Sequence, residues 1–103
     1  MNSRAKGKRG ELELVHILKG YGFEVRRGQQ YSGANGDADI EGLAGYHVEV
    51  KRRERLDIEA ALVQSEHDAR EGETPIVAHR RNGEAWKVTL RLADFIELIR
   101  GTE

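Results

Sequence analysis

Residues 37–52 constrain the fold more than any other stretch of the sequence, because they predict two strands joined by a very short loop. Leu43, Ala44 and Gly45 form the loop, with one strand at 37–42 before it and another at 46–52 after it. A three-residue loop with glycine at its last position, where a left-handed conformation is needed, is a favoured hairpin connection. Pairing residue 42 with residue 46 then places residue 39 directly opposite residue 49.

Period-two alternation along this hairpin gathers charge on one face of the sheet. Ile40, Val48 and Val50 face one side, and the other side receives Asp37, Asp39, Glu41, His47, Glu49 and Lys51. Asp39 and Glu49 become cross-strand neighbours, and like charges placed opposite each other destabilise a sheet unless a positive charge lies between them. Mg²⁺ takes oxygen ligands and commonly uses one or two protein carboxylates. We therefore expect Asp39 and Glu49 to bind Mg²⁺, with the backbone carbonyl of Val50 as a third ligand.

Lys51 follows Glu49 by two residues, so it shares the acidic face. Its ammonium could orient an attacking water, lower the pKa of that water, or stabilise charge growing on a phosphate. Metal-assisted phosphodiester hydrolysis is the natural chemistry for such a set. A surface salt-bridge ladder is the alternative, because the chain is 34% charged and such spacings also arise by chance.

The first predicted helix, in GELELVHILKG, carries an acid beside its apolar face. That face contains Leu14, Val15, Ile17, Leu18 and Tyr21. Glu11 lies at its margin, because positions 11, 14, 15 and 18 share a side of a helix with 3.6 residues per turn. A role for Glu11 at the acidic site and a first-turn role toward the helix dipole both fit this position.

The remaining elements complete an α/β chain with an α+β mixed sheet, in the order αβββαββα. Asp57 is a predicted helix cap, and Asn82-Gly83 indicates a type I′ hairpin. Along the chain we expect a helix to Gly20 or Gly22, strands at 23–27, 37–42 and 46–52, a helix at 58–70, strands at 75–81 and 84–90, and a helix at 92–100.

Composition limits the class of protein. With 103 residues we expect one domain over residues 1–103, with a modest core. The absence of cysteine excludes disulfides and thiolate metal sites and fits a reducing cytoplasm. No apolar run reaches membrane-spanning length, and the basic N-terminus lacks the apolar core of a signal peptide. We expect a soluble, cytoplasmic protein without a membrane partner.

Basic residues are clustered although the formal net charge is only −1. Such a net charge argues against coating nucleic acid through bulk charge. Clustered arginines and lysines can still form one phosphate-binding face, with a solvated mixed surface as the alternative. Phosphate contacts position DNA without reading its sequence, so structure-selective binding is expected. The candidate contacts are Lys6, Lys8, Arg9, Arg27, Arg52, Arg53, Arg55, Arg80 and Arg81, with residues 1–7 as a flexible basic arm.

The sequence favours neither a histidine metal site nor a base-stacking platform. His47 shares the acidic face and is a competent ligand, but a partly exposed strand histidine is the expected state. His16, His67 and His79 show no metal-site spacing. Trp86 is expected to pack against the protein, because no second aromatic residue pairs with it.

Taken together, these motifs resemble the PD-(D/E)XK nuclease superfamily, and within it the small archaeal-type and phage-type Holliday junction resolvases. The resemblance covers roughly residues 7–81. Ala38 stands where the superfamily name would put proline, and residues beyond 81 match less well. The matching motifs are GKRGELELVHIL, GFEVRR, YSGANG, Asp39-Ile40 and Glu49-Val50-Lys51.

This resemblance implies a restriction-endonuclease-like core and a Mg²⁺-dependent DNA endonuclease, with Mn²⁺ able to substitute. It implies a homodimer that cuts four-way junctions. Asp39, Glu49 and Lys51 would be catalytic, and Glu11 would assist metal binding, directly or through water. Ser32 would contact the scissile strand, and Gln64 would lie near the active site.

Two alternatives stay open from the sequence. A nicking, flap-cutting or restriction-like nuclease would use the same residues on another DNA substrate. A non-catalytic nucleic-acid-binding or assembly protein would retain only the scaffold, although the presence of all four polar positions weighs against it.

Overall fold

The computed structural model describes residues 3–28 and 38–101, with side chains from residue 7 onward. The expected order of helices and strands is confirmed. The elements are α1 (Ser3–Gly20), β1 (Arg26–Arg27), β2 (Ile40–Glu41), β3 (Tyr46–Arg52), α2 (Ile58–Asp68), β4 (Thr74–Arg80), β5 (Lys87–Thr89) and α3 (Leu92–Gly101).

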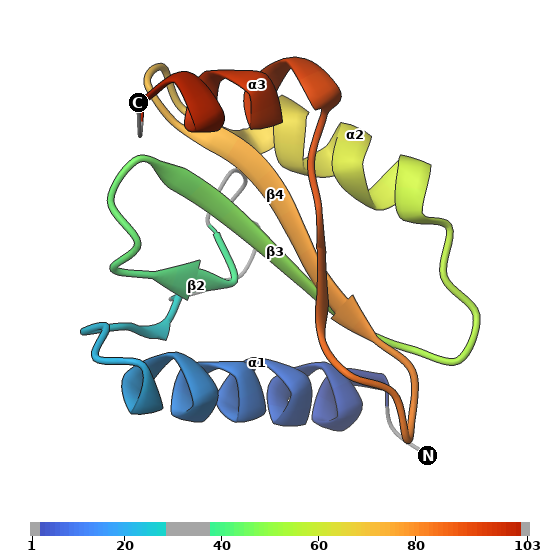
Figure 1. Ribbon diagram of the computed structural model, residues 1–103. Helices are drawn as coiled ribbons and strands as arrows, with labels where there is room; N and C mark the ends of the chain where they lie inside the picture. The colour runs from blue at the N-terminus through green and yellow to red at the C-terminus, as the bar shows by residue number, and fades with distance from the viewer. Residues whose placement is uncertain (1–2, 29–37, 102–103) are drawn as a thin grey trace.

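The five strands form one mixed sheet in the order β1-β2-β3-β4-β5. β3 and β4 are parallel and are connected through α2, while the other neighbouring strands are antiparallel. α1 lies on one side of the sheet, and α2 and α3 lie on the other (Figure 1). The long central strands are therefore covered on both faces, as strands of a parallel pair usually are.

The predicted register of the β2–β3 hairpin is confirmed. Ile40 pairs with Val48, which is the pairing that sets residue 39 opposite residue 49. Asp39 donates its backbone N–H to the carbonyl of Val48 at 2.9 Å, so the pairing extends to the residue before β2. Gly45 has φ +86°, the left-handed conformation that the loop requires.

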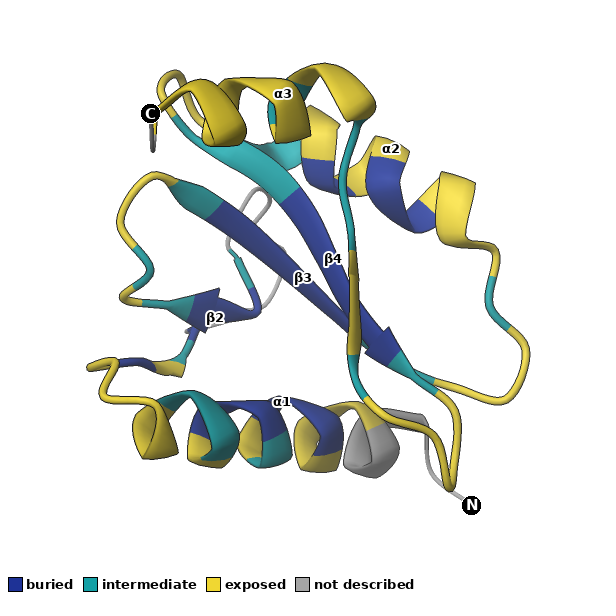
Figure 2. Cartoon of the chain, viewed as in Figure 1, coloured by how far each residue is buried: buried dark blue, intermediate teal, exposed yellow. Residues whose placement is uncertain are grey.

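β3 and β4 are mostly buried, and α1 and α2 each have buried residues on the side that faces the sheet (Figure 2). On the α1 face, Leu14 and Val15 of α1 pack with the buried residues Val25, Ile40, Val48, Val50, Ile76 and Ala78. On the α2 face, Ala61 and Leu62 pack against Val77. Asp57 caps α2 as predicted, because its Oδ1 accepts the N–H of Ala60 at 2.9 Å.

Several predicted boundaries differ from the structure. α1 begins at Ser3, so residues 3–7 continue this helix and the predicted separate arm is wrong. Tyr21 follows the end of α1 and is 79% exposed, so it does not join the apolar face. The type I′ turn at Asn82-Gly83 is also wrong: among the described residues only glycines have positive φ, and Asn82 does not. The hairpin instead uses a longer connection between β4 and β5.

α3 has an apolar face that the rest of the described chain covers only in part. None of its residues is buried (Figure 2). Leu92, Phe95, Ile96 and Ile99, which share one side of the helix, are 36–72% exposed. Within residues 3–28 and 38–101, no helix combines the length and the apolarity needed to cross a membrane.

Gly42 supports the hairpin in a way that permits a matched test. Its φ is +109°, and a Cβ added there would lie 2.3 Å from the carbonyl oxygen of Glu24. Gly45 in the same hairpin also has positive φ, but an added Cβ would meet nothing within 4 Å. We expect Gly42→Ala to lower the free energy of unfolding by more than about 3 kcal/mol, and Gly45→Ala by only about 1–2 kcal/mol, the cost of the strained backbone alone.

Urea denaturation of both variants measures this difference. Equal losses in the two variants would show that the approach of Gly42 to Glu24 does not constrain the hairpin.

Candidate active site

Asp39, directly before β2, and Glu49, within β3, are brought together by the pairing of these two strands. Each residue is only 7% exposed, and their carboxyl groups share a hydrogen bond. Asp39 Oδ2 also accepts the backbone N–H of Val50 at 2.8 Å, which fixes its orientation. The N–H and C=O of one strand residue point to the same edge, so the carbonyl of Val50 faces the side of the strand on which Asp39 lies. This placement agrees with its predicted role as a ligand.

The crowding of these two acids changes the protonation of Glu49. Burial, the negative charge of Asp39 and the hydrogen bond with Asp39 raise the pKa of Glu49 to about 8, and the charge of Lys51 opposes this shift. Near neutral pH the pair therefore holds one proton between two carboxyl groups. A cation bound between them would replace that proton and remove the repulsion.

Glu11 comes to the same place from α1. It is 7% exposed, and its pKa is raised by burial and by the charge of Asp39, while Arg27 and Lys51 act in the opposite direction. Glu11 is not in the first turn, because α1 begins at Ser3. The helix-dipole explanation for this acid is therefore wrong.

Two contacts hold Glu11 in position. Arg27 Nε donates to Glu11 Oε1 at 2.9 Å. Gly10 allows α1 to approach β3 closely, since a Cβ there would lie 3.0 Å from Cβ of Arg52. The packing of α1 against β3 thus explains why glycine precedes glutamate in the motif GKRGELELVHIL. The glycine permits the close approach that brings Glu11 toward the acids of the sheet.

Burial excludes the surface salt-bridge ladder that the sequence left open. Glu11, Asp39 and Glu49 are all buried, and Lys51 is half-buried. The charge of Lys51 acts to lower the pKa of both Glu49 and Glu11. The charge of Asp39 acts to raise the pKa of the same two acids. All four predicted residues therefore gather at one site.

Three of the arginines predicted to contact phosphate are engaged within the protein. Arg27 binds Glu11, as described above. Arg52 and Arg80 both contact Glu13, with Nε to carboxylate distances of 3.7 and 2.8 Å. Glu13 Oε1 also accepts the indole N–H of Trp86 at 2.9 Å, and Arg80 lies over the Trp86 ring. These arginines stabilise the contact between α1 and the sheet, and their contact with DNA stays a prediction.

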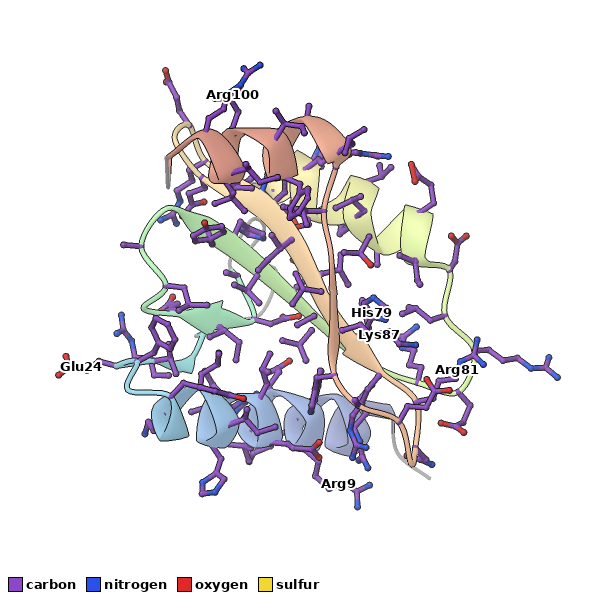
Figure 3. All side chains as sticks on the ribbon, in the orientation of Figure 1. Arg9, Glu24, His79, Arg81, Lys87 and Arg100 are labelled. Carbon is purple, nitrogen blue, oxygen red and sulfur yellow. The ribbon has the colours of Figure 1, made fainter. Side chains whose placement is uncertain are left out.

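The remaining predicted contacts differ in position. Arg9 and Arg81 project away from the sheet (Figure 3). Ser32 and the side chain of Lys6 lie outside the described part of the chain. Gln64 is exposed on α2 and donates to Asp68 Oδ2 at 2.6 Å. Since the charge of Asp68 also raises the pKa of Glu49, Gln64 reaches the margin of the site through Asp68. Among the predicted phosphate contacts with described side chains, the exposed basic residues are Lys8, Arg9, Arg53, Arg55 and Arg81.

Sequence reasoning missed the burial of His47 beside Glu49, and it missed that the charge of Asp68 acts on Glu49. His47 was expected to be partly exposed, but it is 1% exposed and its Nε2 lies 3.1 Å from Glu49 Oε1. A signal was present, because a strand that leads through a helix into a parallel strand is usually covered on both faces. Asp68, near the end of a helix, carried no comparable signal.

The stability of the metal-free protein is expected to fall as the pH rises from about 4.5 to about 8. In the folded state the pKa of Glu49 is about 8, whereas the ordinary value is 4.5. Between these values the folded state binds more protons than the unfolded state. The free energy of unfolding therefore declines with pH, by at most about 1.4 kcal/mol per pH unit for one proton.

Denaturant unfolding at several pH values, in EDTA, compares the wild type with Glu49→Gln. The variant has no proton to lose at this position, so its profile should be flatter across the same range. Parallel profiles for the two proteins would contradict the raised pKa.

No family model and no curated protein matches the chain. Among solved structures, the fold is similar to that of Hjc, a Holliday junction resolvase from the archaeal hyperthermophile Archaeoglobus fulgidus. The two chains are 22% identical with a TM-score of 0.58, and the match covers 82% of this chain and 76% of Hjc. At this level of identity, the likeness establishes the shared α+β fold alone.

Proposed function

We propose that this chain is a divalent-metal-dependent endonuclease that hydrolyses phosphodiester bonds in branched DNA, with four-way junctions as its substrate. The observation that carries the proposal is the buried pair of Asp39 and Glu49, joined by Lys51 and by Glu11 from α1. The likeness of the fold to a Holliday junction resolvase supports the choice of substrate.

The residues at the site fit a hard divalent cation. Asp39 and Glu49 repel each other when both are charged, and this repulsion adds to burial, the larger cause, in raising the pKa of Glu49. The donors are oxygen atoms, which suits Mg²⁺, with Mn²⁺ as a substitute. Asp39, Glu49 and the carbonyl of Val50 would hold the ion, and Glu11 would assist through a water. When bound, Mg²⁺ supplies a water of lowered pKa and polarises a phosphate oxygen.

The chain's own residues provide orientation and charge. The N–H of Val50 fixes Asp39, and Arg27 fixes Glu11. Lys51 interacts with both Glu11 and Glu49, so its ammonium is placed to orient the attacking water or to stabilise negative charge on the phosphate. Exposed lysines and arginines contact the DNA backbone without reading base sequence.

The active protein is proposed to be a homodimer that pairs through α3. The exposed apolar face of α3, with Phe95 and Ile96 at its centre, is unusual for a monomer. A two-fold dimer buries the same patch on both subunits. It also presents two active sites to a junction that itself has near two-fold symmetry.

Purified protein incubated with a synthetic four-way junction, a flap and a linear duplex, each with Mg²⁺ or EDTA, tests the function. We expect paired nicks in the junction that require Mg²⁺, and little cutting of the duplex. Preferred cutting of the flap would keep the chemistry and change the substrate. Binding without cleavage, or cutting in EDTA, would overturn the proposal.

A further inference from the structure

A second group of potential metal ligands lies on the α2 face of the sheet, beside the proposed active site. It consists of His47 and Glu49 on β3 and Asp68 on α2. One ligand atom from each residue lies within 4.8 Å of the others, and His47 Nε2 is 3.1 Å from Glu49 Oε1. The side chains of His47, Glu49 and Asp68 are 2%, 9% and 12% exposed.

We propose that His47, Glu49 and Asp68 form a separate binding site for a transition-metal cation, Zn²⁺ above all, with Mn²⁺ and Co²⁺ binding more weakly. Imidazole nitrogen suits Zn²⁺ and similar ions, whereas Mg²⁺ prefers oxygen ligands. Histidine nitrogen and carboxylate oxygen are both zinc ligands, and zinc sites with an open position commonly have three protein ligands. This donor set therefore differs in chemistry from the all-oxygen set around Asp39.

The surrounding side chains support ligation by orienting the donors. His47 Nδ1 faces Glu73 Oε1 at 3.7 Å, on the side of the ring away from Glu49. A metal-binding histidine usually directs its second ring nitrogen toward such a carboxylate, which fixes its tautomer and orientation. Asp68 is held by Gln64, which donates to its Oδ2 at 2.6 Å, and its pKa is lowered by hydrogen bonds from Gln64 and His67. Asp68 is thus charged near neutral pH.

A hollow of about 360 Å³ lies beside the histidine of this group. His47 and Glu73 line it, together with Arg70 and Tyr46. The hollow lies beside the imidazole, so the histidine can be reached although it is buried within the sheet.

Glu49 belongs to both sites, because its Oε1 faces His47 while its carboxyl group bonds to Asp39. A cation at His47 therefore acts on a carboxylate of the proposed active site. The second site does not depend on the nuclease proposal, because it concerns cation binding in the absence of DNA.

Titration of the metal-free full chain with Zn²⁺ in millimolar Mg²⁺, followed by calorimetry, and with Co²⁺, followed by its visible absorption, tests the proposal. We expect one Zn²⁺ per chain. His47→Gln and Asp68→Asn should each lower Zn²⁺ affinity at least about 10-fold, the scale on which loss of a supporting residue already weakens a metal site. Asp39→Asn should still bind one Zn²⁺ per chain, and the surface control His16→Gln should change Zn²⁺ affinity by less than about 3-fold.

Circular dichroism in EDTA measures whether each variant is folded. If loss of the buried His47 disturbs the fold, Asp68→Asn still tests the site, because Asp68 is less buried. Zn²⁺ affinity unchanged in both site variants, or no Zn²⁺ bound by the wild type, would overturn the inference. Loss of binding in Asp39→Asn alone would place the ion at the other site. Failure of Mg²⁺-dependent cleavage would instead count against the nuclease proposal, because these titrations contain no DNA.

Discussion

Asp39→Asn is expected to reduce the rate of junction cleavage by at least about 10²–10³-fold while the protein still folds and binds DNA. Asparagine keeps the shape of the side chain, and its amide oxygen can still accept the N–H of Val50, a bond that is 2.8 Å long in the structure. It removes the charge with which Asp39 would hold a cation. Loss of one electrostatic group of an active site typically has an effect of this size.

Single-turnover cleavage with saturating enzyme measures the rate, and a gel shift in Ca²⁺ measures DNA binding. Glu71→Gln, an exposed change of the same kind in the turn after α2, provides the matched control and should cleave at the wild-type rate. Cleavage by Asp39→Asn at the rate of this control would remove Asp39 from the mechanism. Cleavage that is lost together with DNA binding would point to a disturbed fold.

The position of Asp39 opposite Glu49 could be predicted because it depends only on local rules. The loop before Tyr46 requires glycine at its last position, and side chains alternate along each strand, so the register follows from the loop length. Glu11 was also recognisable, since helical periodicity places it beside the core-facing residues. These rules act within a hairpin or a helix and need no knowledge of the rest of the fold.

The environment of the site could not be predicted in the same way, because it depends on which helix covers which face. Alternation placed His47 on the face of the acids but could not show that α2 buries that face. Arg52 and Arg80 belong to basic clusters in the sequence, yet both contact Glu13 on α1. Charge patterning identifies the basic residues of a chain and not their partners.

Two errors in the predicted elements have specific physical causes. The N-terminal residues are polar and basic, with no apolar stripe to mark a helix, although α1 begins at Ser3. Asn82-Gly83 has the residues of a tight turn, but β4 and β5 pair as Ala78 with Val88, and this register leaves a longer connection between them. The register between β4 and β5 therefore set the length of the connection, and the preference of Asn82-Gly83 for a two-residue turn did not.

Phe95→Glu is expected to convert the proposed dimer into a monomer and raise its dissociation constant at least about 100-fold. Burial of a phenylalanine side chain contributes about 1.5–3 kcal/mol, and a two-fold interface loses this contribution twice. Each 1.4 kcal/mol corresponds to about a tenfold change in affinity. Phe95 is 47% exposed in the single chain, so the substitution does not disturb the core.

Light scattering after size-exclusion chromatography, over a range of protein concentrations, gives the oligomeric state of the wild type and of Phe95→Glu. The control is Ala93→Glu, which adds the same charge to α3 away from the apolar stripe of Leu92, Phe95, Ile96 and Ile99 and should leave the dimer intact. Paired incision of a junction should fall with the dimer, because one subunit carries one active site, while single nicks persist. A wild type that is monomeric at all concentrations would remove α3 as the contact between subunits.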